Sequence, residues 1–227
     1  MHGSVVDGEL TWAEQKPLAE RWTLIVPDRP GYGESPDVER EDFEADAPLV
    51  AELLGDGAHL VGHSYGGVVA LLAAAARPEA VWSLTLVEPP AFGVARGDPA
   101  VEALVSDFAE YWRTGPSDPE AFLRGFLERV GSNARLPSPL PSRFERGARV
   151  LRTERGPWEA EIPLDDLGAA PFRKLVISGG HSEAFEAVCD VLAERLHAER
   201  AVIRGAGHSV QRTGRFNERL ERFLAGQ

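Results

Sequence analysis

Short apolar runs alternate with helix-like patterns along most of the chain. Each run holds four to six residues and is bounded by Gly, Pro or Asp, which is typical of strands buried on both faces of a parallel sheet. The alternation predicts an α/β fold with a mainly parallel sheet flanked by helices. The predicted strands are Trp22–Pro27, Ala58–Gly62, Ser83–Val87, Lys174–Ser178 and Ala201–Arg204.

The segments between these runs carry the spacing of helices. Thr11–Glu14 has the form of a capping box and predicts that a first helix follows it. A second predicted helix has Pro48 near its first turn and carries Leu49, Val50, Leu53 and Leu54. A third begins at the turn after Ser64, runs through Val68 to Ala76 and ends before Pro78. The last carries apolar residues at i, i+4, i+7 and i+8, namely Phe216, Leu220, Phe223 and Leu224.

The strand pattern is interrupted between about Phe92 and Leu167. Two apolar stripes at helical spacing occur there, and the Pro-rich segment Leu136–Pro141 precedes a third candidate helix near Ser142–Arg152. We therefore predict a small helical cap over residues 92–167 that lines a substrate pocket, inserted into a core formed by residues 1–91 and 168–227. The stripes are Val101, Leu104, Val105, Phe108, Tyr111 and Trp112, and then Phe122, Phe126, Leu127 and Val130.

Composition and charge narrow the range of partners. The chain has 24 Lys and Arg against 36 Asp and Glu, a net charge of −12, which disfavours binding to nucleic acid or to anionic membranes. The single cysteine, Cys189, lies in an apolar pattern and is expected in the core, and no Cys/His spacing predicts a metal site. With neither a signal peptide nor a membrane-length apolar run, we expect a cytoplasmic protein that acts on a small molecule without a cofactor.

The sequence Gly62-His63-Ser64-Tyr65-Gly66 matches the pattern G-x-S-x-G. An apolar run precedes it and an alanine-rich helical segment follows, which is the strand, sharp turn and helix that a nucleophile elbow requires. The flanking glycines allow backbone to pack tightly around a strained residue. We therefore predict that Ser64 is a nucleophile.

A serine hydroxyl needs a base that removes its proton. His208 lies in the loop between the last predicted strand and the last predicted helix, where it can reach across the carboxyl edge of a parallel sheet. His63 is expected to point away from the position of the base, while His59 precedes a strand and His197 lies at a helix end. His208 is the predicted base.

Four motifs occur in order along the chain: His2-Gly3, Asp28–Ser35, Gly62–Gly67 and Gly205–His208. Together they resemble the α/β-hydrolase fold family, whose pattern runs His-Gly, D-R-P-G-x-G-x-S, G-H-S-x-G-G and G-x-G-H. The resemblance covers most of the chain outside the predicted cap and implies a cofactor-free mechanism. It also implies that the backbone N–H groups of Tyr65 and Ser4 form the oxyanion hole. Asp28, Gly31 and Gly33 are expected to shape a turn.

The chain departs from the family pattern in two places. The family has an apolar strand directly before its His-Gly, whereas this sequence begins at Met1; we expect either a start assigned too late or a truncated relative, with N-terminal strands missing. The family acid usually lies in G-x-x-D after the strand that follows the cap, where this chain has Ser182. Glu88, at the end of the strand after the elbow helix, is the preferred acid; Glu183, or no working acid, stays open.

These residues predict a serine hydrolase that acts on an ester, thioester or similar acyl substrate. Ser64 would attack the carbonyl with His208 as its base and Glu88 orienting the imidazole. A ligand-binding or weakly active protein of the same fold is an alternative, and so is acyl transfer or perhydrolysis at the same site. The sequence leaves the substrate and the oligomeric state open.

Overall fold

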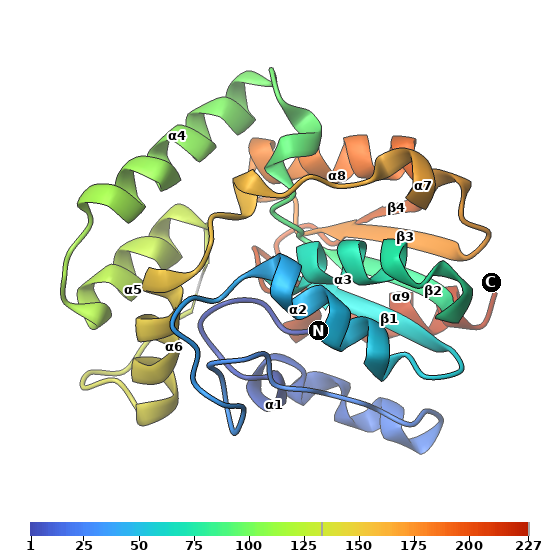
Figure 1. Ribbon diagram of the computed structural model, residues 1–227, viewed down its shortest axis with the longest axis horizontal. Helices are drawn as coiled ribbons and strands as arrows, with labels where there is room; N and C mark the ends of the chain where they lie inside the picture. The colour runs from blue at the N-terminus through green and yellow to red at the C-terminus, as the bar shows by residue number, and fades with distance from the viewer. Residues whose placement is uncertain (133, 227) are drawn as a thin grey trace.

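The computed structural model describes residues 1–132 and 134–226. Asn133 and Gln227, which fall within the predicted cap and core ranges, lie outside the described residues. Four parallel strands form one sheet in the order β1-β2-β3-β4, so the predicted parallel sheet is confirmed (Figure 1). The strands are β1 (Ala58–His63), β2 (Val81–Val87), β3 (Arg173–Ser178) and β4 (Glu199–Val202).

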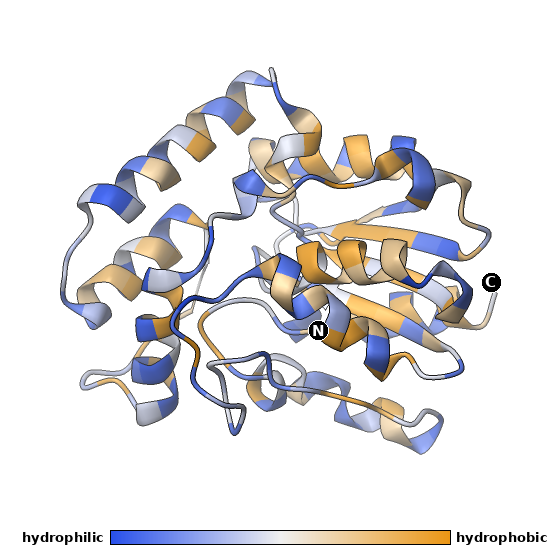
Figure 2. Cartoon of the chain, viewed as in Figure 1, coloured by the Kyte–Doolittle hydropathy of each residue, from blue (hydrophilic) through white to orange (hydrophobic). Residues whose placement is uncertain are grey.

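Helices cover both faces of the sheet. Side chains alternate between the two faces along each strand, so each strand packs apolar residues against helices on both sides. Leu84, Leu86 and Val176 point into the core under α2, α3 and α8, whereas Leu175 and Ile177 point into the core under α9. Figure 2 shows α3 apolar along almost its whole length, as expected for a helix buried against the sheet. These helices are α2 (Phe43–Leu53), α3 (Tyr65–Ala76), α8 (Glu183–Arg195) and α9 (Gly214–Leu224).

Further helices and no strand lie between residues 92 and 167, as far as the structure describes this part. Helices α4, α5 and α6 lie to one side of the sheet, at the left of Figure 1, whereas α7 contacts α3 and α8. Val101 and Phe108 of α4 join the core under α8, while Phe122 and Leu151 belong to a separate cluster between α5 and α6. The division into core and cap stays a prediction. The helices are α4 (Pro99–Thr114), α5 (Pro119–Arg129), α6 (Ser142–Thr153) and α7 (Leu164–Ala169).

Acidic residues cap the first two α-helices of the chain. Asp7 accepts a hydrogen bond from the Leu10 amide (2.9 Å) and starts α1 (Gly8–Thr11). A helix follows the predicted capping box, as a 3-10 helix over Ala13–Glu20, but Thr11 does not cap it. Asp42 likewise caps α2, so Pro48 lies inside that helix and not in its first turn. The helix after Ser64 and the C-terminal helix are confirmed as α3 and α9.

The predicted strand Trp22–Pro27 is not a strand in the structure. Its apolar side chains Leu24, Ile25 and Val26 are 39%, 62% and 41% exposed, and a cavity of about 460 Å³ separates the segment from β1. The edge of β1 contacts Met1 instead: the His63 amide donates to the Met1 carbonyl at 3.0 Å, and the Met1 amino group donates to the carbonyl of Val61. The segment has strand composition, but within residues 1–132 and 134–226 none of the amides of Thr23 to Val26 donates a hydrogen bond.

The last strand begins two residues before the predicted Ala201–Arg204. Its register against β3 runs from Leu175↔Glu199 to Ser178↔Val202. The pairing therefore includes two residues that the apolar pattern did not mark. Cys189 is fully buried in the core, as predicted.

Candidate active site

Ser64 occupies the sharp turn between β1 and α3. Its φ of 52° and ψ of −130° are strained for a residue with a side chain. The glycines around it are sterically required: a Cβ at Gly62 would lie 2.5 Å from the Gly66 carbonyl oxygen, and one at Gly66 would lie 2.2 Å from the His2 carbonyl oxygen. The turn therefore presents the Ser64 side chain at the carboxyl edge of the sheet.

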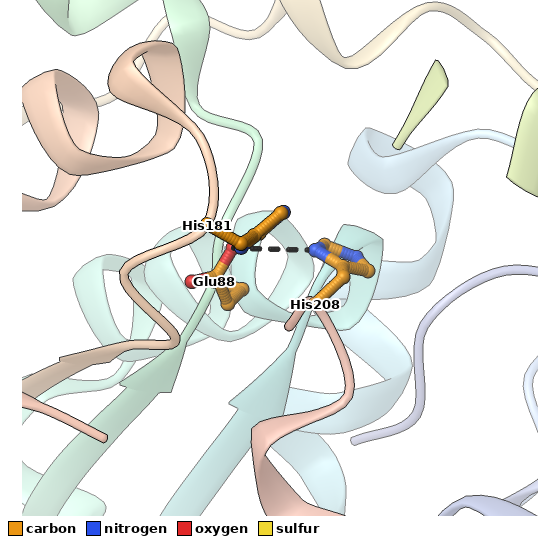
Figure 3. Close-up of side chains that lie close together, drawn as sticks. All are labelled: Glu88, His181 and His208. Carbon is orange, nitrogen blue, oxygen red and sulfur yellow. Dashed lines mark hydrogen bonds and ion pairs between the residues drawn. The ribbon is translucent and has the colours of Figure 1, made fainter. Parts of the chain in front are cut away.

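Ser64, His208 and Glu88 form a continuous line of contacts. The Ser64 Oγ lies 2.9 Å from His208 Nε2, and His208 Nδ1 lies 3.3 Å from Glu88 Oε2. Glu88 follows β2 and His208 lies in the loop after β4, so residues far apart in the sequence meet at one edge of the sheet. Figure 3 shows the contact between Glu88 and His208. All three residues are buried.

The Glu88 carboxylate is held in place by backbone. Its Oε1 accepts a hydrogen bond from the Gly179 amide at 2.5 Å, and its own φ of 50° turns the chain sharply at the end of β2. Burial raises the pKa of the Glu88 carboxyl to about 7. Burial also lowers the pKa of His208 to about 3, so its imidazole is neutral at neutral pH, as a general base must be.

The alternative acid Glu183 is not part of this arrangement. It is the first residue of α8 and is exposed, and it makes no contact with His208 among the described residues. The neighbouring Glu186 pairs with Arg200 at 2.6 Å. Of the two candidate acids, Glu88 and Glu183, it is Glu88 that contacts the His208 imidazole.

The predicted orientation of His63 was wrong. Its ring lies beside His208, with 5.1 Å between the ring centroids, and its Nε2 donates a hydrogen bond to the backbone carbonyl of His208 at 3.0 Å. Gln211 donates to the other ring nitrogen at 3.3 Å. His63 thus ties the elbow to the loop that carries His208. The sequence around His63 does not indicate this contact, because its partner His208 is 145 residues away.

Ser4 and Tyr65 line the same small cavity as Ser64. Gly3 packs so closely that a Cβ there would lie 2.8 Å from the Ser64 Cβ. Tyr65 is the first residue of α3, so its N–H has no acceptor within that helix. Neither this N–H nor that of Ser4 donates to any acceptor among residues 1–132 and 134–226. Both N–H groups are thus unused within the described structure, as donors to a developing negative charge have to be.

A cluster of buried ion pairs lies beside Ser4, and the sequence patterns did not predict it. Arg29 is fully buried and pairs with Glu154 (3.1 Å), Asp46 (3.0 Å) and Glu41. Ser4 Oγ donates to Glu154 at 2.6 Å, which fixes the residue that carries one of the free N–H groups. The predicted turn role of Asp28 is confirmed: its carboxylate accepts hydrogen bonds from the Gly8 and Glu34 amides.

Two cavities meet at Ser64. One, of about 20 Å³, is lined mainly by aromatic rings. The other, of about 160 Å³, is lined by Ser64 and His208 together with Arg135 and Arg212. The helices between residues 92 and 167 contribute to both linings. The aromatic residues of the smaller cavity are Tyr65, Phe92, Phe108, Trp112, Phe126, Trp158 and Phe185.

A model of the alpha/beta hydrolase family matches residues 1–219. The chain belongs to this family. Its similarity to solved structures agrees: it resembles a thermophilic esterase from Thermogutta terrifontis (24% identity, TM-score 0.70, 99% of this chain and 88% of that one). It also resembles MenH from S. aureus (19% identity, TM-score 0.71, 100% and 92%). At these identities the likeness shows the fold alone.

Curated relatives of this alpha/beta hydrolase carry differing activities. It is 39% identical over 169 residues to a pimeloyl-[acyl-carrier protein] methyl ester esterase of Methylococcus capsulatus, covering 67% of this chain and 63% of the relative. It is 29% identical to the dihydrolipoyllysine-residue acetyltransferase component of the acetoin cleaving system of Cupriavidus necator, covering 92% and 58%. The chain thus spans about three fifths of these relatives. No helix in the described part of the chain has the length and apolarity to cross a bilayer.

Proposed function

We propose that the protein is a serine hydrolase that cleaves a carboxylic ester or thioester through an acyl-enzyme on Ser64. The observation that carries the proposal is the line of contacts from Ser64 Oγ to His208 Nε2 (2.9 Å) and from His208 Nδ1 to Glu88 Oε2 (3.3 Å). A nucleophile, a base and an orienting acid within such distances are the constellation of a catalytic triad. The relative named as a methyl ester esterase supports ester chemistry.

In this mechanism, His208 Nε2 accepts the Ser64 proton as Oγ attacks the substrate carbonyl. The imidazolium that forms is stabilised by the Glu88 carboxylate, and the N–H groups of Tyr65 and Ser4 stabilise the oxyanion by about 3 kcal/mol each. His208 then returns the proton to the leaving group. A water molecule repeats the attack on the acyl-enzyme with the same base.

The cavities favour a small acyl group. The aromatic cavity of about 20 Å³ beside Ser64 accommodates few atoms, whereas the cavity of about 160 Å³ beside His208 has room for a larger leaving group. We therefore expect esters of acetate to be cleaved faster than esters of octanoate. The acyl chain of the longer ester would have to displace Trp112 or Trp158.

Labelling with a fluorophosphonate tests the proposal directly, because this probe reacts with an activated serine. We expect one adduct on Ser64, hydrolysis of p-nitrophenyl acetate, and loss of both in Ser64→Ala. Ser209→Ala, another serine of the larger cavity, is the matched control and should retain labelling. A protein that takes up no probe and cleaves no ester of any chain length would be a binding protein instead.

A further inference from the structure

His181 presents an unused nitrogen to the buried side of Glu88. Its Nε2 lies 3.1 Å from the Val130 carbonyl, so this nitrogen carries the proton and donates it. Nδ1 then holds a lone pair, is buried and has no hydrogen-bond partner among the described residues. It faces Glu88 Oε2 at 3.6 Å, so with the carboxylate ionised and the His181 ring neutral two acceptor atoms oppose each other without a proton between them. A cation would satisfy both atoms.

His208 Nδ1 is a third potential ligand atom beside His181 Nδ1 and Glu88 Oε2. Its Nδ1 lies 3.3 Å from Glu88 Oε2, and the ligand atoms of Glu88, His181 and His208 all lie within 4.8 Å of one another. Figure 3 shows the three side chains converging from separate segments of the chain. Two imidazole nitrogens and one carboxylate oxygen are a known ligand set for Zn²⁺.

The distances fit a small tetrahedral ion. Metal–ligand distances of about 2.0–2.1 Å place neighbouring ligands of a tetrahedron about 3.3–3.4 Å apart. Two of the three separations, 3.3 Å and 3.6 Å, are already near this value. A small rotation of the His181 ring would bring its Nδ1 to a similar distance from His208 Nδ1.

The surroundings also favour a cation. His181 lines an open cleft together with four acidic residues, and Arg200 pairs with two of them, Glu186 and Asp190. The other two are Asp98 and Glu183. The cleft places these carboxylates beside His181, which favours a cation there.

We propose that Glu88, His181 and His208 form an inhibitory site for a divalent transition-metal ion such as Zn²⁺. Neutral His208 has one ring proton. Coordination through Nδ1 moves that proton to Nε2, which then donates to Ser64 Oγ and no longer accepts from it. The ion thereby removes the general base without entering the substrate cavities. This consequence rests on the proposed hydrolase function, whereas metal binding itself does not.

Binding is tested by calorimetry on chelator-treated protein titrated with Zn²⁺. We expect one ion per chain in the wild type and in Ser64→Ala, at least a tenfold weaker affinity in His181→Phe, and unchanged affinity in the control His197→Phe, whose histidine is exposed at the end of α8. Bound Co²⁺ should show the visible spectrum of a four- or five-coordinate site in the wild type and not in His181→Phe. Absence of binding to the wild type, or equal binding by His181→Phe, overturns the proposal.

Inhibition is tested with p-nitrophenyl acetate. Saturating Zn²⁺ should lower kcat by at least about 100-fold with KM unchanged, and EDTA should restore it, because a general base contributes about that much. His181→Phe should keep most of its own metal-free rate at the same Zn²⁺ concentration. Full activity of the Zn²⁺-loaded wild type overturns the inhibitory role. A wild type that binds Zn²⁺ but has no esterase activity at all contradicts the proposed function and not the metal site.

Discussion

The ring of His63 holds the backbone of His208: its Nε2 donates to the His208 carbonyl across 3.0 Å. The residue directly before the nucleophile thus fixes the loop that carries the base. Gln211 completes the arrangement by donating to the opposite ring nitrogen at 3.3 Å. The spacing between Ser64 and His208 depends on this bridge.

His63→Phe should therefore lower kcat about tenfold, because the loop that carries His208 loses its anchor. It should also lower the free energy of unfolding by about 1–3 kcal/mol, since the His208 carbonyl and the Gln211 amide lose their partner. Steady-state kinetics and urea unfolding measure the two effects. The rate of fluorophosphonate labelling should fall in parallel with kcat. His63→Phe with lower stability but an unchanged labelling rate would show a purely structural role.

Glu88→Gln should lower kcat by about 10⁴-fold and leave the fold intact. An amide cannot stabilise the imidazolium of His208, and it can hold the wrong tautomer of the ring. Glu183→Gln is the control and should remain within about twofold of the wild type, because its carboxylate is exposed to solvent. Comparison of kcat for the two variants checks this. Near-normal activity of Glu88→Gln would mean that Ser64 and His208 act as a dyad.

The pH dependence of kcat should report the Glu88 carboxyl. Its pKa is raised by burial to about 7, and only its ionised form stabilises the imidazolium, so kcat should fall about tenfold per pH unit as the pH drops below about 7. His208, with its pKa lowered to about 3, stays neutral over this range and adds no second limb. The profile should be measured in EDTA, so that no metal ion binds to Glu88 and His208. In Glu88→Gln the limb should disappear; a limb of unchanged position there would assign it to another group.

Ser64 and His208 could be proposed as nucleophile and base from the sequence because their signals are local. Glycines must flank a strained Ser64, and a histidine in the loop after the last strand lies at the carboxyl edge of a parallel sheet. The acid could not be decided locally, since Glu88 and Glu183 both follow strands that end at this edge. The contact between Glu88 and His208 spans 120 residues. The Ser4–Glu154 contact spans 150 residues and the His181–Val130 contact spans 51, so no short motif records either of them.

The segment Trp22–Pro27 illustrates the other limit of sequence patterns. Its composition matches that of β3, but a strand also needs a partner for its N–H and C=O groups. Among the described residues, none of the amides of Thr23 to Val26 donates a hydrogen bond. An apolar, β-favouring composition shows that a segment can form a strand, whereas the fold determines whether a neighbouring strand is present to pair with it.

These four amides should therefore exchange with solvent deuterium as fast as those of an unprotected peptide. The matched control is Leu175–Ile177 of β3, an apolar run paired with neighbours on both sides, whose amides should exchange orders of magnitude more slowly. Hydrogen exchange followed by mass spectrometry of short peptides separates the two. A side-chain test runs in parallel: Ile25→Lys should change the free energy of unfolding by less than about 0.5 kcal/mol, because Ile25 is 62% exposed. Ile177→Lys, at a fully buried position, should prevent folding. Slow exchange of the Thr23–Val26 amides would show that the segment is paired in solution.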